Sequence, residues 1–536
     1  MRAFAKLLDG LVYTRSRNAK LKLIADYLRA TPDPDRGWTM AALTGAIDLK
    51  AVKPAAIRAM VERRVDAALF AMSRDFVGDL AETVALIWPK PEGFEPELDD
   101  GSLTVSAVIG RLEAAPRARA PDELAAMLDH LDSSGRYALI KLATGALRVG
   151  ISARLAKTAL AQAFGLDVDQ VEELWHGLAP PYAPLFDWAE GRGERPVPEN
   201  LPVFRPFMLA HPLEGGAVDL ADYAAEWKWD GIRVQIVGIG GAVRLYSRAG
   251  DDITATFPDV AAAFPGTGVL DGELLVRGEA QGGAGHGGGA ASFNALQQRL
   301  GRKQVSAKMQ ADYPAFVRLY DILFDGAEDL RALSWTERRE RLESFVERLP
   351  PARFDLSALI AAADFEALAD IRLGARDAAI EGVMLKRRDS PYVAGRRAGL
   401  WYKWKRDPLV ADCVMMYAQR GHGKRSSFYS DYSFGCWTAP PEEGGELLPV
   451  GKAYSGFTDE ELKALDRFVR NHTVQRFGPV REVDKTLVLE VAFDSIHESK
   501  RHKSGLAMRF PRIRRIRADK PAAEADLIAA LRRMIA

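Results

Sequence analysis

Cysteine is scarce in this sequence, with only Cys413 and Cys436 among its 536 residues. Two cysteines are too few for a disulfide framework or a four-cysteine zinc site, and their separation matches no metal-binding spacing. The sequence therefore argues against a disulfide-stabilised or zinc-finger protein. We expect both cysteines to be ordinary buried thiols.

Long apolar runs are also missing. No stretch approaches the roughly 20 uninterrupted apolar residues that a membrane-spanning helix requires. The first residues, MRAFAKLLDGLVYTRSR, contain no apolar core of the kind found in secretory signal peptides. We therefore expect a soluble, cytoplasmic protein with no membrane partner.

The sequence has no excess of either charge, because 73 basic residues balance 73 acidic ones. Overall charge therefore gives no reason to expect a nucleic-acid partner, but the local distribution does. The segment from Arg501 to Lys520, RHKSGLAMRFPRIRRIRADK, contains eight Lys or Arg residues and one acid, a concentration suited to phosphate. A solvated basic face is the alternative, although the apolar residues within FPRI are typical of a packed strand.

Length and composition predict a multidomain protein. At about 150 residues per domain, 536 residues suggest three domains, and 48% hydrophobic content is enough to give each a core. Prolines crowd between Ala179 and Pro212, which forbids a long helix and marks a boundary. The pattern changes again after Asp407-Pro408. We expect domains at residues 1–200, 201–407 and 408–536.

Residues 1 to about 180 show the periodicity of helices. After Pro121, apolar residues recur at one-face helical spacing; they are Leu124, Met127, Leu128 and Leu131. In SARLAKTALAQAFG, Ser152 is suited to cap the start of a helix and Gly165 to end it. We expect an all-α domain.

The turn before that helix, GALRVGISARLAK, contains Arg148, Gly150 and Ser152. Backbone N–H groups at a helix start, together with one arginine, can hold a DNA phosphate. A plain turn permitted by glycine is the alternative reading.

The middle of the chain contains EWKWDGIR, from Glu226 to Arg233. Side chains alternate along a strand, so Lys228 and Asp230 should point one way and Trp227 and Trp229 the other. The alternation continues to Ile236, and Gly240-Gly241 can then turn the chain back into AVRLYSR. We expect a hairpin with one chemical and one apolar face.

Charged groups recur on short segments after this motif. We expect Asp271-Gly272 to introduce the strand that carries Glu273, and Lys403 and Lys405 to share one strand face. Further segments present Tyr320 with Asp321, and Glu381.

The glycine-rich run EAQGGAGHGGGAAS lacks the Gly-Lys-Ser/Thr ending of a phosphate-binding loop. We interpret it as a flexible surface insertion in which His286 has no role.

The last 130 or so residues combine short strands with one helix. Thr458 and Glu461 form a predicted capping box, and Phe457 and Leu462 are placed to staple the helix start. This pattern fits a five-stranded barrel of the oligonucleotide-binding (OB) type. A two-sheet sandwich is the alternative.

Taken in order, KWDGIR, YSRAG, DGEL, LYDIL, EGVMLKR, WYKWKR and RFPRIRRIRADK closely resemble the motif set of the ATP-dependent DNA ligases. The resemblance covers about residues 205–520. It extends more loosely, through LATGALRVGISARLAKTALAQAFG, into the helical DNA-binding domain of the larger members. In layout the chain resembles the bacterial three-domain form, with an all-α DNA-binding domain, an α+β adenylation domain and an OB-fold barrel.

The resemblance implies an enzyme that uses ATP and Mg²⁺ to seal nicks in double-stranded DNA. In that reaction a lysine becomes joined to AMP, AMP passes to the 5′-phosphate, and the 3′-hydroxyl attacks. The resemblance also implies a monomer that encircles its substrate.

The same resemblance assigns roles to individual residues. Lys228 becomes adenylated, Glu226 contacts the adenine and Tyr320, in a position often held by phenylalanine, stacks on it. Glu273 and Glu381 serve the ribose and magnesium. Arg233 and Arg248 bind ribose or phosphate, and the phosphates are faced by Arg397, Lys403 and Lys405. The last motif contains Arg512, Arg517 and Lys520.

The chemistry itself requires such residue types. A lysine amine that attacks the α-phosphate must be neutral, and cations such as Lys403 and Lys405 would favour the neutral form while neutralising phosphate oxygens. Phosphoryl transfer depends on positioning and charge stabilisation more than on additional nucleophiles.

Three alternative functions fit the sequence less well. An RNA ligase or capping guanylyltransferase shares the lysine motif but is not expected to have the N-terminal helical domain. NAD is disfavoured as the donor, because ligases that use it have a four-cysteine zinc module. A non-catalytic nucleic-acid-binding protein would leave Lys228, Glu273 and Glu381 without a common purpose.

Overall fold

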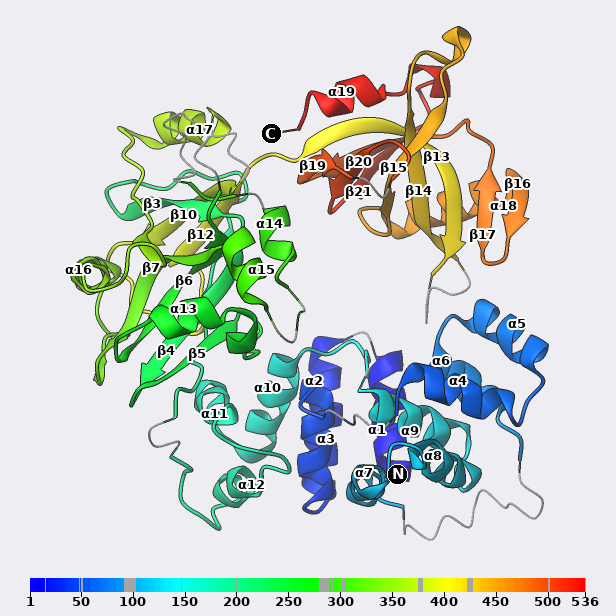
Figure 1. Cartoon of the computed structure of the whole chain (residues 1–536), viewed down its shortest axis with the longest axis horizontal. Coiled ribbons are helices and arrows are strands. Elements are labelled where there is room, and N and C mark those ends of the chain that lie inside the picture. Colours follow the sequence, from blue (N-terminus) through cyan, green and yellow to red (C-terminus); the bar gives the residue numbers. More distant parts are fainter. Residues whose placement is uncertain are drawn as a thin grey trace. The chain divides into compact units, whose positions relative to one another are not determined.

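A computed structural model describes the chain except for residues 15, 48, 50, 51, 91–102, 146, 198–200, 279–288, 292, 301, 303, 304, 375–378, 422–427, 500, 501 and 536, and the side chains of 76 and 294. It forms two compact units. Figure 1 labels the helices and strands along the whole chain. The first comprises Met1–Phe164, Pro180–Ala183 and Pro408–Ala536, and the second comprises Gly165–Ala179 and Pro184–Asp407. The proposed glycine-rich insertion lies largely outside the described residues.

The N-terminal part of the first unit is helical, as the periodicity predicts. Its helices are α1 (Arg2–Tyr13), α2 (Arg17–Ala30), α3 (Asp35–Thr44), α4 (Pro54–Glu62), α5 (Ala67–Val77), α6 (Leu80–Ile87), α7 (Val105–Ala114), α8 (Ala120–Asp129), α9 (Ser133–Thr144) and α10 (Ala153–Phe164). The apolar face of α8 is buried through Leu124, Met127 and Leu128. Both predicted ends of α10 are confirmed: the Ser152 hydroxyl accepts the Leu155 N–H at 3.2 Å, and Gly165 adopts a φ of 71°.

The C-terminal part of the first unit is built mainly of strands. They are β13 (Leu409–Arg420), β14 (Tyr429–Trp437), β15 (Leu447–Ala453), β16 (Thr473–Phe477), β17 (Val480–Val483), β18 (Val488–Phe493), β19 (Ser495–Glu498), β20 (Leu506–Arg509) and β21 (Arg512–Arg517). Strand β13 pairs with β14 along one edge and with β18 and then β17 along the other. Helices α18 (Asp459–Asn471) and α19 (Ile528–Arg532) accompany the strands. The predicted capping box of Thr458 and Glu461 begins α18.

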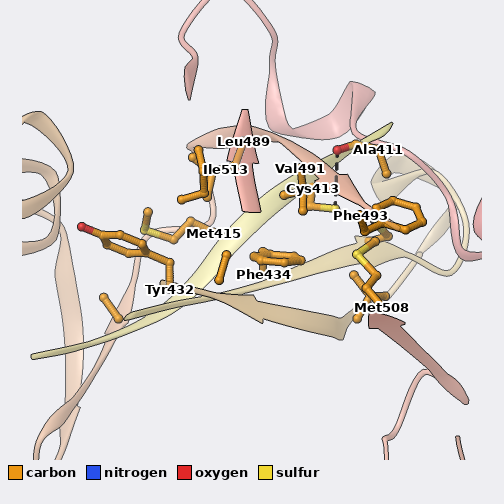
Figure 2. Close-up of a cluster of buried hydrophobic side chains, with 14 of the residues drawn as sticks. Ala411, Cys413, Met415, Tyr432, Phe434, Leu489, Val491, Phe493, Met508 and Ile513 are labelled. Carbon is orange, nitrogen blue, oxygen red and sulfur yellow. Dashed lines mark hydrogen bonds between the residues drawn. The ribbon is translucent and has the colours of Figure 1, made fainter. Parts of the chain in front are cut away.

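One core supports these strands (Figure 2). Cys413 and Met415 from β13, Phe434 from β14 and Val491 from β18 are buried in it. Cys436 is buried too, with its sulfur 3.5 Å from that of Cys413. The prediction of two ordinary buried thiols is therefore confirmed.

Two sheets form the second unit. The larger contains β5 (Ala242–Ser247), β4 (Ile232–Ile239), β6 (Gly268–Val276), β7 (Ala315–Asp325), β8 (Glu328–Asp329) and β9 (Phe354–Leu356). The smaller contains β2 (His211–Pro212), β12 (Trp401–Lys405), β10 (Ile380–Arg387) and β3 (Tyr223–Trp229), and a separate pair joins β1 (Met208–Leu209) to β11 (Gly395–Arg396). The helices are α11 (Val168–Trp175), α12 (Ala183–Ala189), α13 (Pro258–Ala263), α14 (Phe293–Gln297), α15 (Ala307–Asp312), α16 (Trp335–Val346) and α17 (Phe365–Gly374).

The lysine motif joins the two sheets. Strand β3 ends at Trp229 and β4 begins at Ile232, so Asp230 and Gly231 carry the chain from one sheet to the other. A Cβ atom at Gly231 would lie 2.5 Å from the carbonyl oxygen of Leu274 on β6, so a larger residue would not fit there without a shift of the backbone. The predicted hairpin is confirmed for β4 and β5, which Gly240 and Gly241 connect at positive φ. The expectation that its first strand also carries the lysine is wrong, because the strand is interrupted at Asp230-Gly231 and Lys228 lies on β3 in the other sheet.

The expectation that Asp271-Gly272 introduces a strand is wrong, because both residues lie in the middle of β6. Asp271 is buried there by its ion pair with Arg233, whose Nη2 is 2.5 Å from the carboxylate. Gly272 permits close approach of β7, since a Cβ atom would lie 2.6 Å from the side chain of Val317.

Helix α11 packs within the second unit although it precedes the proline-rich segment. Glu173 accepts a hydrogen bond at 2.5 Å from Arg331, which follows β8. The ring of His176 lies 5.2 Å from that of Phe204 and 5.4 Å from that of Tyr246.

In the described part of the chain, no helix is both long enough and apolar enough to cross a membrane.

These contacts predict that residues 166–200 stabilise the second unit. A fragment of residues 201–407 should melt at a lower temperature than one of residues 166–407. Losing one ion pair and the apolar contacts should cost about 2 kcal/mol or more, or roughly 4–8 °C. Differential scanning calorimetry checks the difference, and equal melting temperatures would contradict it.

Candidate active site

A pocket of about 410 Å³ opens in the second unit, and strands of both sheets line it. Nine of the residues that the motifs single out lie on its wall. They are Glu226, Lys228, Arg233, Arg248, Glu273, Tyr320, Glu381, Lys403 and Lys405. The structure therefore brings together residues separated by nearly 180 positions in the sequence.

Lys228 lies on β3, and its ammonium group donates a hydrogen bond to Glu381 Oε2. Lys405 Nζ lies 3.4 Å from the same oxygen. Burial pushes the pKa of Glu381 upward, but Lys228 and Lys405 outweigh it and lower that pKa to about 2. Glu381 is therefore a carboxylate held between two cations.

A backbone irregularity aims Glu381 into the pocket. The pairing of β10 with β3 shifts between Ile380 and Gly382, as at a β-bulge. Gly382 has a φ of 152°, and a Cβ atom there would lie 2.3 Å from the carbonyl oxygen of Trp404. The Glu-Gly sequence is thus suited to turning one acid out of the strand's regular alternation.

Glu273 lies on β6 near Lys228 and Glu381. Burial raises its pKa to about 8, more than Lys228 lowers it, and the negative charge of Glu381 raises it further. At neutral pH one acid of the pocket is consequently ionised and the other carries its proton.

Arg233 is held by its neighbours. Its guanidinium donates to Asp271 and, at 2.7 Å, to the carbonyl oxygen of Met208. Burial favours loss of its proton, but the charge of Asp271 prevails and raises the pKa of Arg233 further.

Burial, together with Arg396 and Arg248, lowers the pKa of Lys403. The wall is therefore strongly positive around Lys403.

Two functional candidates escaped the sequence analysis. Lys386 is buried, with Nζ 3.2 Å from Glu226 Oε1, and Arg339 Nη1 lies 3.7 Å from the same oxygen. Strict alternation along β10 would put Glu381 and Lys386 on opposite faces, but with the register shift between Ile380 and Gly382 both line the pocket, and the sequence does not reveal that shift. Arg339 lies on α16, outside every motif, and no signal points to it.

The structure does not place Arg397 in the pocket; its side chain is exposed. Arg512 and Lys520 belong to the first unit. Arg512 forms an ion pair with Asp494 at 2.9 Å, and Lys520 one with Asp412 at 2.8 Å. Arg517 also contacts Asp412, at 3.1 Å.

The three candidates for DNA contact lie together on the turn before α10. Arg148 is exposed and has a φ of 45°, and Gly150 has a φ of 70°. Lys20 Nζ donates to the carbonyl oxygen of Gly150 at 2.7 Å, which holds the turn to α2. Ser152 serves as the helix cap.

Comparison with known families matches two regions of the chain. Residues 207–405 match the family described as "ATP dependent DNA ligase domain", and residues 425–520 match "ATP dependent DNA ligase C terminal region".

Similar proteins are named as ligases. A probable DNA ligase of Koribacter versatilis is 36% identical over 420 residues, which cover 73% of this chain and 70% of the relative. A DNA ligase 1 of Korarchaeum cryptofilum is 32% identical over 558 residues, covering 99% and 97%. The solved structure named Pmar-Lig_Pre is 16% identical, with a TM-score of 0.58 over 96% of this chain and 99% of its own, and shares the fold.

The pKa of Glu273 generates a prediction about stability. A free glutamate ionises near pH 4.5 and Glu273 near 8, so its stabilising contribution is complete below 4.5 and is lost as pH rises through 8. Glu273→Gln keeps the shape without the ionisation. Without ATP or metal, this variant should gain melting temperature relative to wild type between about pH 6 and about pH 9.

Glu366→Gln, at an exposed position of α17, is the matched control and should show no such trend. A difference between Glu273→Gln and wild type that stays constant with pH would contradict the assignment.

Proposed function

The chain belongs to the ATP-dependent DNA ligases, and we propose that Lys228 is the residue through which it passes AMP to a nick in duplex DNA. The observation that carries this assignment is the position of Lys228 in the pocket, with Glu273 and Glu381 beside it and Lys403 and Lys405 on the same wall. Phosphoryl transfer requires one nucleophile among groups that position and neutralise phosphate, and this pocket offers that arrangement.

In the proposed first step, Lys228 Nζ attacks the α-phosphorus of ATP, a phosphoramidate bond forms and pyrophosphate leaves. AMP then passes to the 5′-phosphate of the nick. The 3′-hydroxyl attacks that phosphate and AMP is released. Tyr320 would stack on the adenine, and Arg248, Lys403 and Lys405 would neutralise phosphate oxygens.

Lys228 must first lose a proton. Its side chain is paired with Glu381, and a lysine engaged in such an ion pair is not free to attack. Lys405 lies close enough to compete for Glu381, so a shift of this carboxylate toward Lys405 would release Lys228.

The pocket also fits magnesium. Among the described residues, no group of three or more His, Cys, Asp or Glu residues could hold a metal ion by itself. Mg²⁺ is commonly held by one or two carboxylates together with phosphate oxygens and water, and Glu273 and Glu381 would supply such a pair. The ion would contribute charge neutralisation at the phosphates.

We assign residues 1–200 to DNA binding, 201–407 to adenylation and 408–536 to an OB-fold domain, except that residues 165–179 and 184–200 pack with the adenylation domain. Strand pairing supports the OB fold: β13 contacts β14 and β18, β14 contacts β15, and β18 contacts β21. The Ile513 N–H, on β21, donates at 3.0 Å to the carbonyl oxygen of Ser455 just beyond β15, where a barrel would close. In the helical domain, Arg148, Gly150 and Ser152 would meet DNA phosphate.

Replacing the nucleophile should abolish the covalent adduct. Lys228→Ala and Lys228→Arg should both fail to form a labelled protein with ATP, because a guanidinium stays protonated and does not attack. Labelling with ATP radioactive at the α-phosphate, followed by denaturing electrophoresis, measures this. Lys308→Ala, at an exposed position of α15, should be labelled like wild type. Labelling of the Lys228→Ala protein at another lysine would contradict the assignment.

Arg512 and Lys520 should act in lysine adenylation and not in the later steps. Pyrophosphate has to leave opposite the attacking lysine, and cations on a mobile domain can orient the outer phosphates. The later steps contain no pyrophosphate. Replacing both residues by alanine should therefore slow adduct formation by roughly 100-fold or more while leaving closure of an already adenylated nick much less affected.

Two single-turnover rates, adduct formation from ATP and closure of the adenylated nick, check this prediction. Arg514→Ala, an exposed neighbour on β21, is the matched control. Equal losses in both rates would mean that the segment binds DNA or supports its domain, and the orienting role would have to be given up.

A further inference from the structure

Asp412, near the start of β13, gathers the two cations that end the last motif. Its Oδ2 atom accepts hydrogen bonds from Arg517 Nη1 at 3.1 Å and from Lys520 Nζ at 2.8 Å. A backbone turn, in which the Lys520 N–H donates to the carbonyl oxygen of Arg517 at 3.3 Å, brings both side chains to this carboxylate. Asp412 itself lies outside every motif of the family resemblance.

The backbone of Asp412 is held in place by the C-terminal segment. The Asp412 N–H donates to Asp526 Oδ2 at 2.8 Å, and the Asp526 N–H donates to the Asp412 carbonyl oxygen at 2.9 Å. Among the residues that the structure describes, none hydrogen-bonds to Asp412 Oδ1, which is buried. The carboxylate therefore depends on Arg517 and Lys520 at its other oxygen.

Two other acids approach Arg517, but less closely or in a more exposed position. Asp519 pairs with it at 2.9 Å and is 68% exposed, and Glu490 lies 3.7 Å away. The side chain of Asp412 is only 13% exposed. An exposed ion pair contributes little to stability, whereas removing the cations from a largely buried acid leaves its charge unpaired. Arg517 therefore exchanges Asp519 for a phosphate more easily than it leaves Asp412.

A phosphate has room to bind beside Asp412 without replacing it. An ammonium and a guanidinium each have several N–H groups, and the hydrogen bonds to Asp412 use one atom of each side chain. Both side chains are also partly exposed. The same two cations can thus hold Asp412 on one side and a phosphate oxygen on the other.

We propose that Asp412 is a positioning residue for lysine adenylation, which holds Arg517 and Lys520 side by side so that both bind the outer phosphates of ATP. Two adjacent cations repel each other, and a carboxylate between them offsets that repulsion. The phosphates then meet an assembled pair, so less side-chain freedom is lost on binding. This inference rests on the proposed function, in which the last motif orients pyrophosphate.

The variant Asp412→Asn tests this role, because it keeps the shape of the side chain and removes its charge. At subsaturating ATP, single-turnover adduct formation should slow by roughly 10-fold or more, since a charge-assisted hydrogen bond is weakened at each cation. Removal of AMP from the adenylated enzyme by pyrophosphate should slow by a similar factor. Closure of an already adenylated nick should keep its wild-type rate.

Asp431→Asn is the matched control. Asp431 lies on β14 of the same domain, its side chain is 18% exposed and it pairs with Lys452 at 3.3 Å. This variant should form the adduct at the wild-type rate. Asp412→Glu keeps the charge, so it should fold even if Asp412→Asn does not, and it should slow adduct formation less than Asp412→Asn while leaving nick closure unchanged.

A double-mutant cycle asks whether Asp412 acts through the two cations. In a protein that already contains Arg517→Ala and Lys520→Ala, adding Asp412→Asn should change adduct formation by about 2-fold or less. A full effect of Asp412→Asn in that background would overturn the proposal.

Faster adduct formation by Asp412→Asn would overturn it as well, because Asp412 would then compete with phosphate for the cations. Equal losses in adduct formation and nick closure would mean that Asp412 only supports its domain, and an unchanged rate of adduct formation would mean that it has no role in this step. A wild-type adduct on a residue other than Lys228 would instead overturn the proposed function and, with it, this inference.

Discussion

The ion pair between Lys228 and Glu381 is the interaction on which the rest of the pocket depends. It joins the neighbouring strands β3 and β10 on the wall of the pocket and occupies the amine that would attack ATP. Lys405 approaches the same carboxylate, so any movement that favours Lys405 weakens the hold on Lys228. Glu273 nearby stays protonated near neutral pH because of its burial. Glu381 therefore pairs with Lys228 as a carboxylate, whereas Glu273 stays neutral until its proton is removed.

Backbone geometry makes this arrangement possible. Gly231 lets the chain pass from one sheet to the other immediately after the lysine, and Gly382 accompanies the bulge that aims Glu381 inward. A side chain at either glycine would meet a carbonyl oxygen at 2.5 Å or less. The same short segments thus supply both the reactive side chains and the glycines that let the strands approach closely.

Much of this organisation could be predicted from the sequence. The ordered motifs predicted that Lys228, Glu273 and Glu381 serve one site, and helical periodicity predicted α8 and α10. Periodicity could not locate a bulge, so Lys386 was missed, and it misplaced Asp271 at a strand end because Asp-Gly usually marks a turn. Arg339 and the packing of α11 on the second unit arise from contacts between distant segments, which no local pattern records.

The reactivity of Lys228 toward an amine-modifying reagent tests the ion pair most directly. The nucleotide-free enzyme is treated briefly with such a reagent, and modified peptides are quantified by mass spectrometry, with exposed Lys308 as the internal reference. If the ion pair with Glu381 occupies the Lys228 amine, this lysine should react more slowly than Lys308 in wild type and several-fold faster in Glu381→Gln, relative to Lys308. Equal relative reactivity of Lys228 in the two proteins would contradict the account.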